Sequence, residues 1–245
     1  MTFYSQYSKY EDCISEYLEN NSLDNFKRNP EYTYMLEHVN RNQGQEYLEL
    51  IRKTDITQQE ILDFSSKNDS VGNPIKETFG DFSCSPSSLR YIYQAYLIIS
   101  HLKTFNKSVD IVEVGGGYGG LCLALCFFAN KYSVNIESYT IIDLPVVIKF
   151  QQLYLSTFSL KVPIDFIEST TYGSTISKSN LFLISNYCFS EISMEYQKKY
   201  IEHLFPKISH GFFSWNGIPV YDFGFKYSEE EENPKTGLYN KYIRF

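Results

Sequence analysis

The chain has 245 residues, which suits one α/β domain with an appendage. Its net charge is −7 and its 22 basic residues form no block, which argues against binding nucleic acid through phosphate neutralisation. The longest apolar run, Leu121 to Ala129, is too short to span a bilayer, and the acidic first twenty residues do not resemble a signal peptide, so we expect a cytoplasmic protein.

The first part of the chain, residues 1–105, is predicted to be a helical and polar appendage. Apolar residues recur there at intervals of three and four, and a stretch rich in Gly, Pro, Ser and Asp, Lys67–Ser88, is predicted to be a loop. The expected helices are Glu11–Leu18, Pro30–Val39, Gln45–Lys53, Gln58–Ser66 and Ser87–Lys103.

From residue 106 onward, short β-rich runs alternate with helical stretches, which predicts a parallel sheet and an α/β fold. The expected strands are Asp110–Val114, Tyr139–Ile142, Ile164–Ile167, Leu181–Ser185 and Gly211–Trp215. The expected helices are Gly120–Lys131, Pro145–Ser156 and Glu195–Phe205.

The tail offers two more strand candidates, Val220–Phe225 and Tyr239–Phe245. By analogy of fold, they would complete a Rossmann-like, seven-stranded sheet as an edge hairpin. The acidic run between them, Glu229 to Glu232, is interpreted as a solvated loop.

A glycine-rich turn follows the first expected strand directly. Gly115, Gly117 and Gly119 stand in Glu113-Val-Gly-Gly-Gly-Tyr-Gly-Gly120, between a buried strand and an apolar helix. Glycines let a ligand approach the backbone closely, and a helix N-terminus presents free N–H groups to it. The turn therefore predicts a cofactor site.

Two acidic residues help to identify the kind of cofactor, one just before the turn and one at the end of the next expected strand. Asp143 ends the next expected strand, where a carboxylate can accept from ribose hydroxyls. Glu113 is costly at a buried strand end unless it pairs. A cationic methionyl amine would satisfy Glu113 and a diphosphate would be repelled by it, so the pattern favours S-adenosylmethionine over a dinucleotide. A nearby Lys or Arg as the partner of Glu113 remains an alternative.

Three segments resemble the bacterial sugar O-methyltransferases, which belong to the class I S-adenosylmethionine-dependent methyltransferases. They are the glycine turn, Ile142-Asp-Leu-Pro145 and Ser185-Asn-Tyr-Cys-Phe-Ser-Glu191, and upstream pieces from Phe26 onward are similar too. The resemblance implies methyl transfer to a sugar hydroxyl, on a surface polysaccharide or its precursor. It implies a small-molecule or glycan acceptor. The residues after Val109 suffice for the sheet, and the stretch from Glu37 to Tyr47 is dense in hydrogen-bonding groups, so we expect the appendage to form a cap over the acceptor site, with a solvated helical turn as the alternative.

Further site residues are expected after the strands. Leu144, Ser185 and Asn186 are candidate cofactor contacts in addition to the glycines and the two acids. Gln43, Arg90, Tyr187 and Asn216 are candidate acceptor contacts, and Arg90 could instead hold the carboxylate of the cofactor.

Methyl transfer to a hydroxyl needs a base, and His38 and Glu191 are the candidates. For Asn186 and Glu191, helix-capping roles are competing interpretations. No carboxylate or Cys/His cluster with metal-ligand spacing is visible, so we expect no metal. The oligomeric state stays open, a homodimer included.

Three other functions remain open. An NAD-dependent sugar oxidoreductase or epimerase would fit the glycines, but the Tyr-x-x-x-Lys pair is not found near Tyr196. A non-catalytic cofactor-binding module would need no base. N-methylation of an amino sugar is faintly suggested by Asn186-Tyr187, without the prolines of an Asn-Pro-Pro-Tyr loop.

Overall fold

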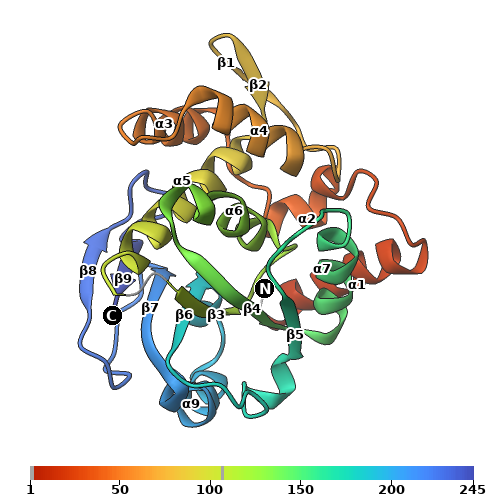
Figure 1. Ribbon diagram of the computed structural model, residues 1–245. Helices are drawn as coiled ribbons and strands as arrows, with labels where there is room; N and C mark the ends of the chain where they lie inside the picture. Colours follow the sequence, from red (N-terminus) through yellow and green to blue (C-terminus); the bar gives the residue numbers. More distant parts are fainter. Residues whose placement is uncertain (1–2, 106–107) are drawn as a thin grey trace.

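The large sheet is built entirely from the chain after residue 107 in the computed structural model, which describes residues 3–105 and 108–245 (Figure 1). Its strand order is β5-β4-β3-β6-β7-β9-β8. The strands are β3 (Ser108–Val114), β4 (Asn135–Asp143), β5 (Ile164–Glu168), β6 (Leu181–Asn186), β7 (Ile208–Trp215), β8 (Ser228–Glu231) and β9 (Lys241–Arg244). The first five strands of this order run parallel, and β9 is antiparallel to both β7 and β8. The predicted α/β, Rossmann-like sheet of seven strands with an edge hairpin is confirmed.

Strand β3 lies at the point where the order of the sheet reverses. It pairs with β4 on one side and with β6 on the other, so that Glu113 lies opposite Ile141 and Ile184. Ligands of open α/β sheets bind in the crevice outside the carboxyl ends of the strands at such a switch point. The glycine turn follows the end of β3, and Asp143 and Asn186 are the last residues of β4 and β6.

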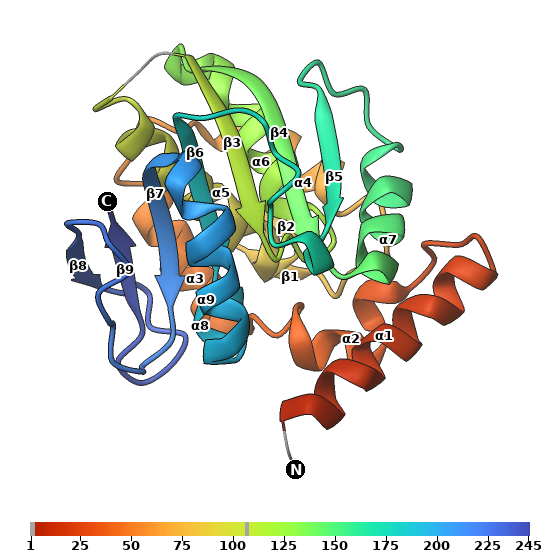
Figure 2. The ribbon, with the colours of Figure 1, turned by 90° about the horizontal axis from the view of Figure 1, so that it is seen from below.

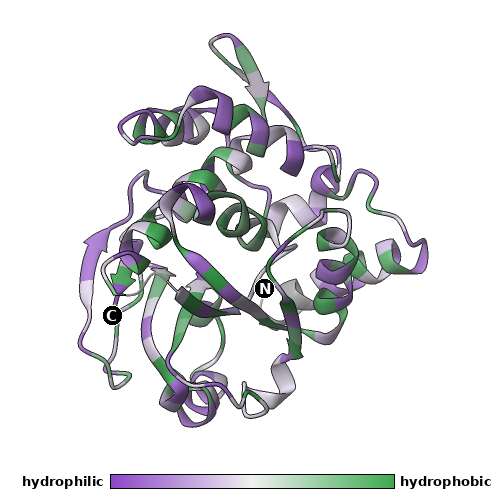
Figure 3. Cartoon of the chain, in the orientation of Figure 1, coloured by the Kyte–Doolittle hydropathy of each residue, from purple (hydrophilic) through white to green (hydrophobic). Residues whose placement is uncertain are grey.

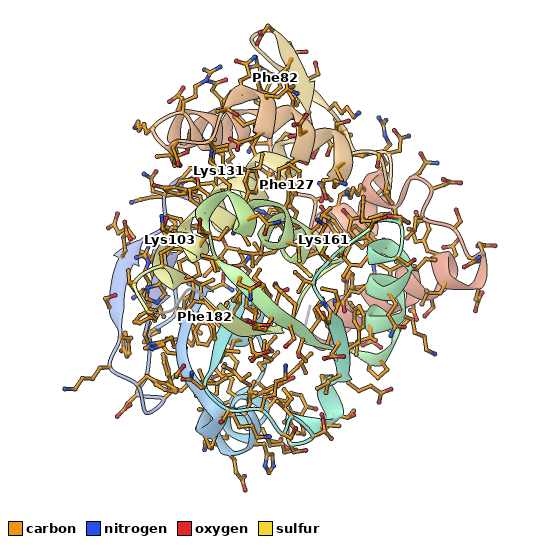
Figure 4. All side chains as sticks on the ribbon, in the orientation of Figure 1. Phe82, Lys103, Phe127, Lys131, Lys161 and Phe182 are labelled. Atoms are coloured by element: carbon orange, nitrogen blue, oxygen red, sulfur yellow. The ribbon has the colours of Figure 1, made fainter. Side chains whose placement is uncertain are left out.

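Helices cover both faces of the sheet (Figure 2). On one face lie α5 (Pro86–Leu102), α6 (Gly120–Phe128) and α7 (Pro145–Leu155), and on the other α8 (Cys188–Glu191) and α9 (Met194–His203). Helix α6 is apolar throughout, as its green colour shows (Figure 3). Most of its residues are buried, and it packs against α5 and α4. Side chains such as Phe182 of β6 fill the interior (Figure 4).

The part of the appendage that precedes α5 packs on the face of the sheet that α5 and α7 cover. Its helices are α1 (Phe3–Glu19), α2 (Pro30–Met35), α3 (Arg41–Ile51) and α4 (Gln58–Asn68), with a hairpin of β1 (Glu77–Phe79) and β2 (Phe82–Cys84). Helix α1 packs on α7 and α3 packs on α5, and one hydrophobic cluster runs from the appendage to the sheet. The 3-10 turns are η1 (Phe26–Arg28), η2 (Ala129–Tyr132), η3 (Ser169–Thr171) and η4 (Phe205–Lys207).

The tail differs from the prediction. The segment Val220–Phe225 is not a strand, and its rings instead pack on β7 and on Phe205 of η4. The edge strand is β8, which lies in the acidic run that was expected to be a loop. Its glutamates remain exposed, and two of them pair with Lys241 and Arg244 of β9. Cross-strand charge pairs thus form an edge that hydrophobic patterning does not reveal.

Two local predictions in the appendage also need correction. The helix expected over Pro30–Val39 ends at Met35, and the predicted loop Lys67–Ser88 contains the β1–β2 hairpin. Among the described helices, none has the length and apolar character needed to cross a bilayer.

Candidate functional site

A cavity of about 840 Å³ opens at the carboxyl ends of β3, β4 and β6. Its walls come from the appendage, the glycine turn, α8, α9 and the loop between β8 and β9. The predicted site residues that line it are His38, Arg90, Glu113, Gly115, Gly117, Asp143, Leu144, Asn186, Tyr187, Glu191 and Asn216. The size is within the usual range for a small-molecule site.

The glycine turn is tightly enclosed on one side. Gly115 has a φ of 79°, and a Cβ atom there would lie 2.3 Å from the Cβ of Cys188. The N–H of Gly115 donates to the carbonyl of Ile142 at 3.0 Å. Only glycine satisfies both the backbone angle and the contact with α8, so the turn holds the ends of β3, β4 and β6 together.

Glu113 is buried at the end of β3, with 1% of its surface exposed. Its Oε2 accepts a hydrogen bond of 2.8 Å from the Tyr139 hydroxyl. Burial raises the pKa of Glu113 to about 8, against the effect of this hydrogen bond. Among the described residues, no Lys, Arg or His forms an ion pair with it. Within residues 3–105 and 108–245, the alternative in which a nearby cation neutralises Glu113 is therefore not found.

Asp143 ends β4 and supports the glycine turn. Its Oδ2 accepts from the N–H of Gly116 at 2.9 Å and from Nε2 of Gln151 at 2.8 Å, and its Oδ1 accepts from the N–H of Leu144 at 2.8 Å. Burial raises its pKa to about 6, opposed by these donors. Since a carboxylate oxygen accepts about two hydrogen bonds, Oδ1 retains capacity for one donor of a ligand.

Helix α5 brings two buried polar side chains to the cavity. The guanidinium of Arg90 donates from Nη2 to the carbonyl of Leu36 at 3.1 Å, while its Nε is buried without a partner among the described residues. One helical turn later, Oε1 of Gln94 accepts from Nδ2 of Asn186 at 3.1 Å, and Nε2 of Gln94 is also without a partner there. Buried donors left unpaired are costly, so this end of the cavity fits a ligand group that accepts hydrogen bonds.

Tyr187, directly after β6, has an uncommon backbone conformation and an unforeseen partner. Its φ is 63° and its ψ is −35°. Its hydroxyl donates a short hydrogen bond to Oε1 of buried Glu232, whose Oε2 accepts from the Thr236 hydroxyl at 2.7 Å. Burial and the Glu232 charge raise the pKa of Tyr187, so the phenol stays protonated. A non-glycine residue in this region is typical of functional sites.

The two candidate bases lie at different parts of the wall. His38 is exposed and lines the cavity, and desolvation of its ring together with the Arg90 charge lowers its pKa to about 4, so its imidazole is neutral at pH 7. Glu191 closes α8, and its Oε1 accepts from Nδ2 of Asn216 at 2.7 Å.

Three predicted residues do not line this cavity. Gly119 is the N-cap of α6 and faces Leu155. The Ser185 hydroxyl donates to the carbonyl of Val114 and accepts from the N–H of Phe189, so it ties β6 to β3 and α8. Gln43 forms a capping box with Asn40 at the start of α3.

Several lining residues were missed, and Gln94 and Thr236 illustrate two different reasons. Gln94 follows Arg90 at helical spacing and could have been found from that spacing. Thr236 could not have been found, because only the folding of the loop between β8 and β9 brings it to the cavity. Within residues 3–105 and 108–245, no group of three or more His, Cys, Asp or Glu side chains is arranged to hold a metal ion.

Comparisons with known proteins give distant similarities. No family model and no curated protein matches the chain. A SAM-dependent methyltransferase structure from Aquifex aeolicus is similar with a TM-score of 0.44 and 17% identity, over 58% of this chain and 85% of that one. The N-methyltransferase NodS from Bradyrhizobium japonicum, in complex with S-adenosylhomocysteine, has a TM-score of 0.38 and 14% identity, over 53% and 62%. The mitomycin 7-O-methyltransferase MmcR has a TM-score of 0.41 and 13% identity, over 56% and 39%. Similarities of this size carry no information on activity.

Proposed function

We propose that the chain is an S-adenosylmethionine-dependent methyltransferase that transfers the methyl group to a sugar hydroxyl. The observation that carries the proposal is the buried carboxyl of Glu113, which lines the cavity with no cationic partner from the described residues. A ligand ammonium group at this position would stabilise the carboxylate, whereas a diphosphate would be repelled by it.

The other residues around the turn fit the same cofactor. Asp143 has capacity left on Oδ1 for one ribose hydroxyl. Leu144 and Asn186 line the cavity beside it, and Gly117 allows close approach of a ligand to the backbone. The unpartnered Nε of Arg90 fits a carboxylate, either of the methionyl group or of an acidic acceptor.

Bound S-adenosylmethionine supplies an electrophilic methyl group, and the chain must orient the acceptor and take up its proton. His38 and Glu191 are the proposed proton acceptors, since both line the cavity. The lowered pKa of His38 keeps its imidazole neutral at pH 7 but makes it a weaker base than an ordinary histidine. Asn216 orients the carboxylate of Glu191 through its amide hydrogen bond.

A sugar hydroxyl as the acceptor is supported by the polar groups gathered beyond the end of β6. Tyr187, Asn216, Thr236 and Asn240 line that side of the cavity and offer hydroxyl and amide groups at its wall. The hydroxyls of Tyr187 and Thr236 donate to Glu232 and the amide of Asn216 donates to Glu191, so these groups are held in place. Their oxygen atoms can accept hydrogen bonds from the hydroxyls of a sugar. The resemblance to bacterial sugar O-methyltransferases points to a surface polysaccharide or its precursor.

The test is transfer of labelled methyl from S-adenosylmethionine to the surface polysaccharide of the encoding organism, followed by acid hydrolysis and identification of O-methyl sugars. His38→Ala and Glu191→Gln are compared with the exposed control Glu168→Gln. Loss of the true base should lower the rate about a hundredfold while cofactor affinity stays within about twofold. Label found only on nitrogen, or only on protein, would contradict a sugar hydroxyl as the acceptor.

A further inference from the structure

A second cavity, of about 540 Å³, adjoins the first at His38. His38 lines both cavities, and Glu37 on one side of it lines only the second. The wall between them is the short segment after α2, which Arg90 holds through its hydrogen bond to the carbonyl of Leu36. A ligand that reaches His38 from the first cavity therefore meets a further space beyond it.

The second cavity contains a buried hydrogen-bonding atom that the described residues leave unsatisfied. The Oε1 atom of Glu37 is buried and accepts no hydrogen bond within 3.5 Å from those residues, while the carboxyl group as a whole is attracted by Lys27 and Arg90 and interacts with Ser87 and Tyr118. A buried carboxyl oxygen in this state is costly, and a ligand hydroxyl would supply the missing donor.

The same cavity exposes apolar surface that the fold does not cover. Tyr34 is 68% exposed and Ile75 is 58% exposed, and both line the cavity. The face of a tyrosine ring is a large, rigid apolar surface with a polar tip. A ring next to hydrogen-bonding groups suits the apolar face and the hydroxyl edge of a pyranose.

The charged groups of the cavity do not favour an anionic ligand. The ammonium of Lys27 donates to the carbonyl of Asn68 at 2.7 Å and lies over the ring of Tyr118. Arg28 donates from Nε to the carbonyl of Asn73 at 2.6 Å, and Arg41 lies 3.9 Å from Glu77. Lys27 and Arg28 are engaged by carbonyl groups, Arg41 is largely exposed, and Glu37 adds a carboxyl group to the cavity, so a neutral, hydroxylated ligand fits better than a phosphate or carboxylate.

We propose that the second cavity binds a neutral sugar unit adjacent to the one that is methylated, so that the acceptor is an oligosaccharide or polysaccharide end that passes His38. This inference rests on the proposed function and adds a second subsite to it. Glu37 receives a hydroxyl of this unit and Tyr34 stacks on its ring, while the first cavity holds the cofactor and the reacting unit.

The experiment compares acceptors of different length. The surface polysaccharide of the encoding organism is partially hydrolysed and sized into mono-, di- and trisaccharide fractions, and kcat/KM for methyl transfer is measured for each. The wild-type chain should show a rise of at least about fivefold from one unit to two, the size expected for one stacked ring with one buried hydrogen bond.

Two variants locate this gain in the second cavity. Tyr34→Ala and Glu37→Gln should each lower the disaccharide-to-monosaccharide ratio of kcat/KM about fivefold or more. Tyr34 is exposed, so its removal should not affect folding. The control is Tyr239→Ala, an 81% exposed tyrosine that lines neither cavity, and it should keep the wild-type ratio.

The outcomes separate this inference from the proposed function. Transfer at the same kcat/KM for all lengths, or an unchanged ratio in both variants, overturns the second subsite and leaves the proposed function standing. Transfer to none of the fractions, by protein that binds S-adenosylhomocysteine, overturns the sugar acceptor and the second subsite with it.

Discussion

Replacing Glu113 with glutamine is predicted to remove a loss of stability that occurs as the pH rises. Burial raises the pKa of Glu113 from its ordinary value of 4.5 to about 8 in the folded chain. Below pH 4.5 the carboxyl is protonated in both the folded and the unfolded chain. Between pH 4.5 and about 8 the unfolded chain releases this proton while the folded chain retains it, so the free energy of unfolding falls across this window.

The size of the effect follows from the two pKa values. Each unit of difference corresponds to 1.36 kcal/mol, so between pH 5 and pH 8 this carboxyl lowers the stability of the unliganded chain by about 3.5 kcal/mol. Glutamine keeps the shape and has no proton to release. The glutamine variant should therefore become more stable than the wild-type chain by about that amount on going from pH 5 to pH 8.

Urea unfolding at the two pH values measures the change, with Trp215 as the probe, because it is the only tryptophan and is fully buried. The matched control is Glu168→Gln at the exposed end of β5, which should follow the wild-type pH dependence. If the curves of wild-type chain and Glu113→Gln remain parallel from pH 5 to pH 8, Glu113 is not a buried, unpaired carboxyl and the reasoning is refuted.

Three further substitutions test the cavity. Gly115→Ala should lower the free energy of unfolding by well over about 1 kcal/mol, because the added Cβ would collide with Cys188. The control is Gly80→Ala, which has a φ of 72° and no atom within 4 Å of the added Cβ, so it measures the cost of the backbone angle alone. Equal melting temperatures of the two variants would contradict the collision with Cys188. Asp143→Asn should weaken S-adenosylhomocysteine binding roughly tenfold or more through a lost charged hydrogen bond, and unchanged calorimetric affinity would remove Asp143 from the site. Arg90→Gln should weaken S-adenosylhomocysteine but not methylthioadenosine, which lacks the carboxylate; if both bind as before, Arg90 contacts the acceptor instead.

The centre of the site was predictable because it depends on strand ends. Glu113, Asp143 and Asn186 lie at the carboxyl ends of three parallel strands. The carboxyl ends of parallel strands meet at one edge of the sheet, so these residues are brought together even if the exact register of the strands is not known. The buried strand, the glycines and the apolar helix make that edge recognisable in the sequence.

The outer walls were not predictable, because they depend on long-range packing. Glu232 belongs to an acidic run and was expected to be solvated, yet it is buried and accepts a hydrogen bond from the hydroxyl of Tyr187. Tyr187 directly follows β6 and lies 45 residues earlier in the chain. The aromatic run Val220–Phe225 has strand-like composition, but its rings pack against β7 and Phe205 instead of joining the edge. Composition does not distinguish a hydrophobic segment that pairs from one that covers a core.

Polar density in the sequence was a poor guide to the acceptor site. Gln43 looked like a sugar ligand among other amides, but its side chain satisfies the backbone of Asn40. A side chain that makes such a local hydrogen bond is not available to a ligand, and the sequence alone does not distinguish the two roles. Glu37, six residues before Gln43, has the buried oxygen without a partner.

Calorimetry can compare S-adenosylhomocysteine and NAD as ligands of the Glu113 cavity, at pH 7 in two buffers with different ionisation enthalpies. We expect S-adenosylhomocysteine to bind and to release about one proton, because its ammonium group converts the largely protonated Glu113 to the carboxylate. NAD should give no binding heat. Binding of NAD without binding of S-adenosylhomocysteine would contradict a methyltransferase, and binding of S-adenosylhomocysteine without proton release would contradict the role given to Glu113.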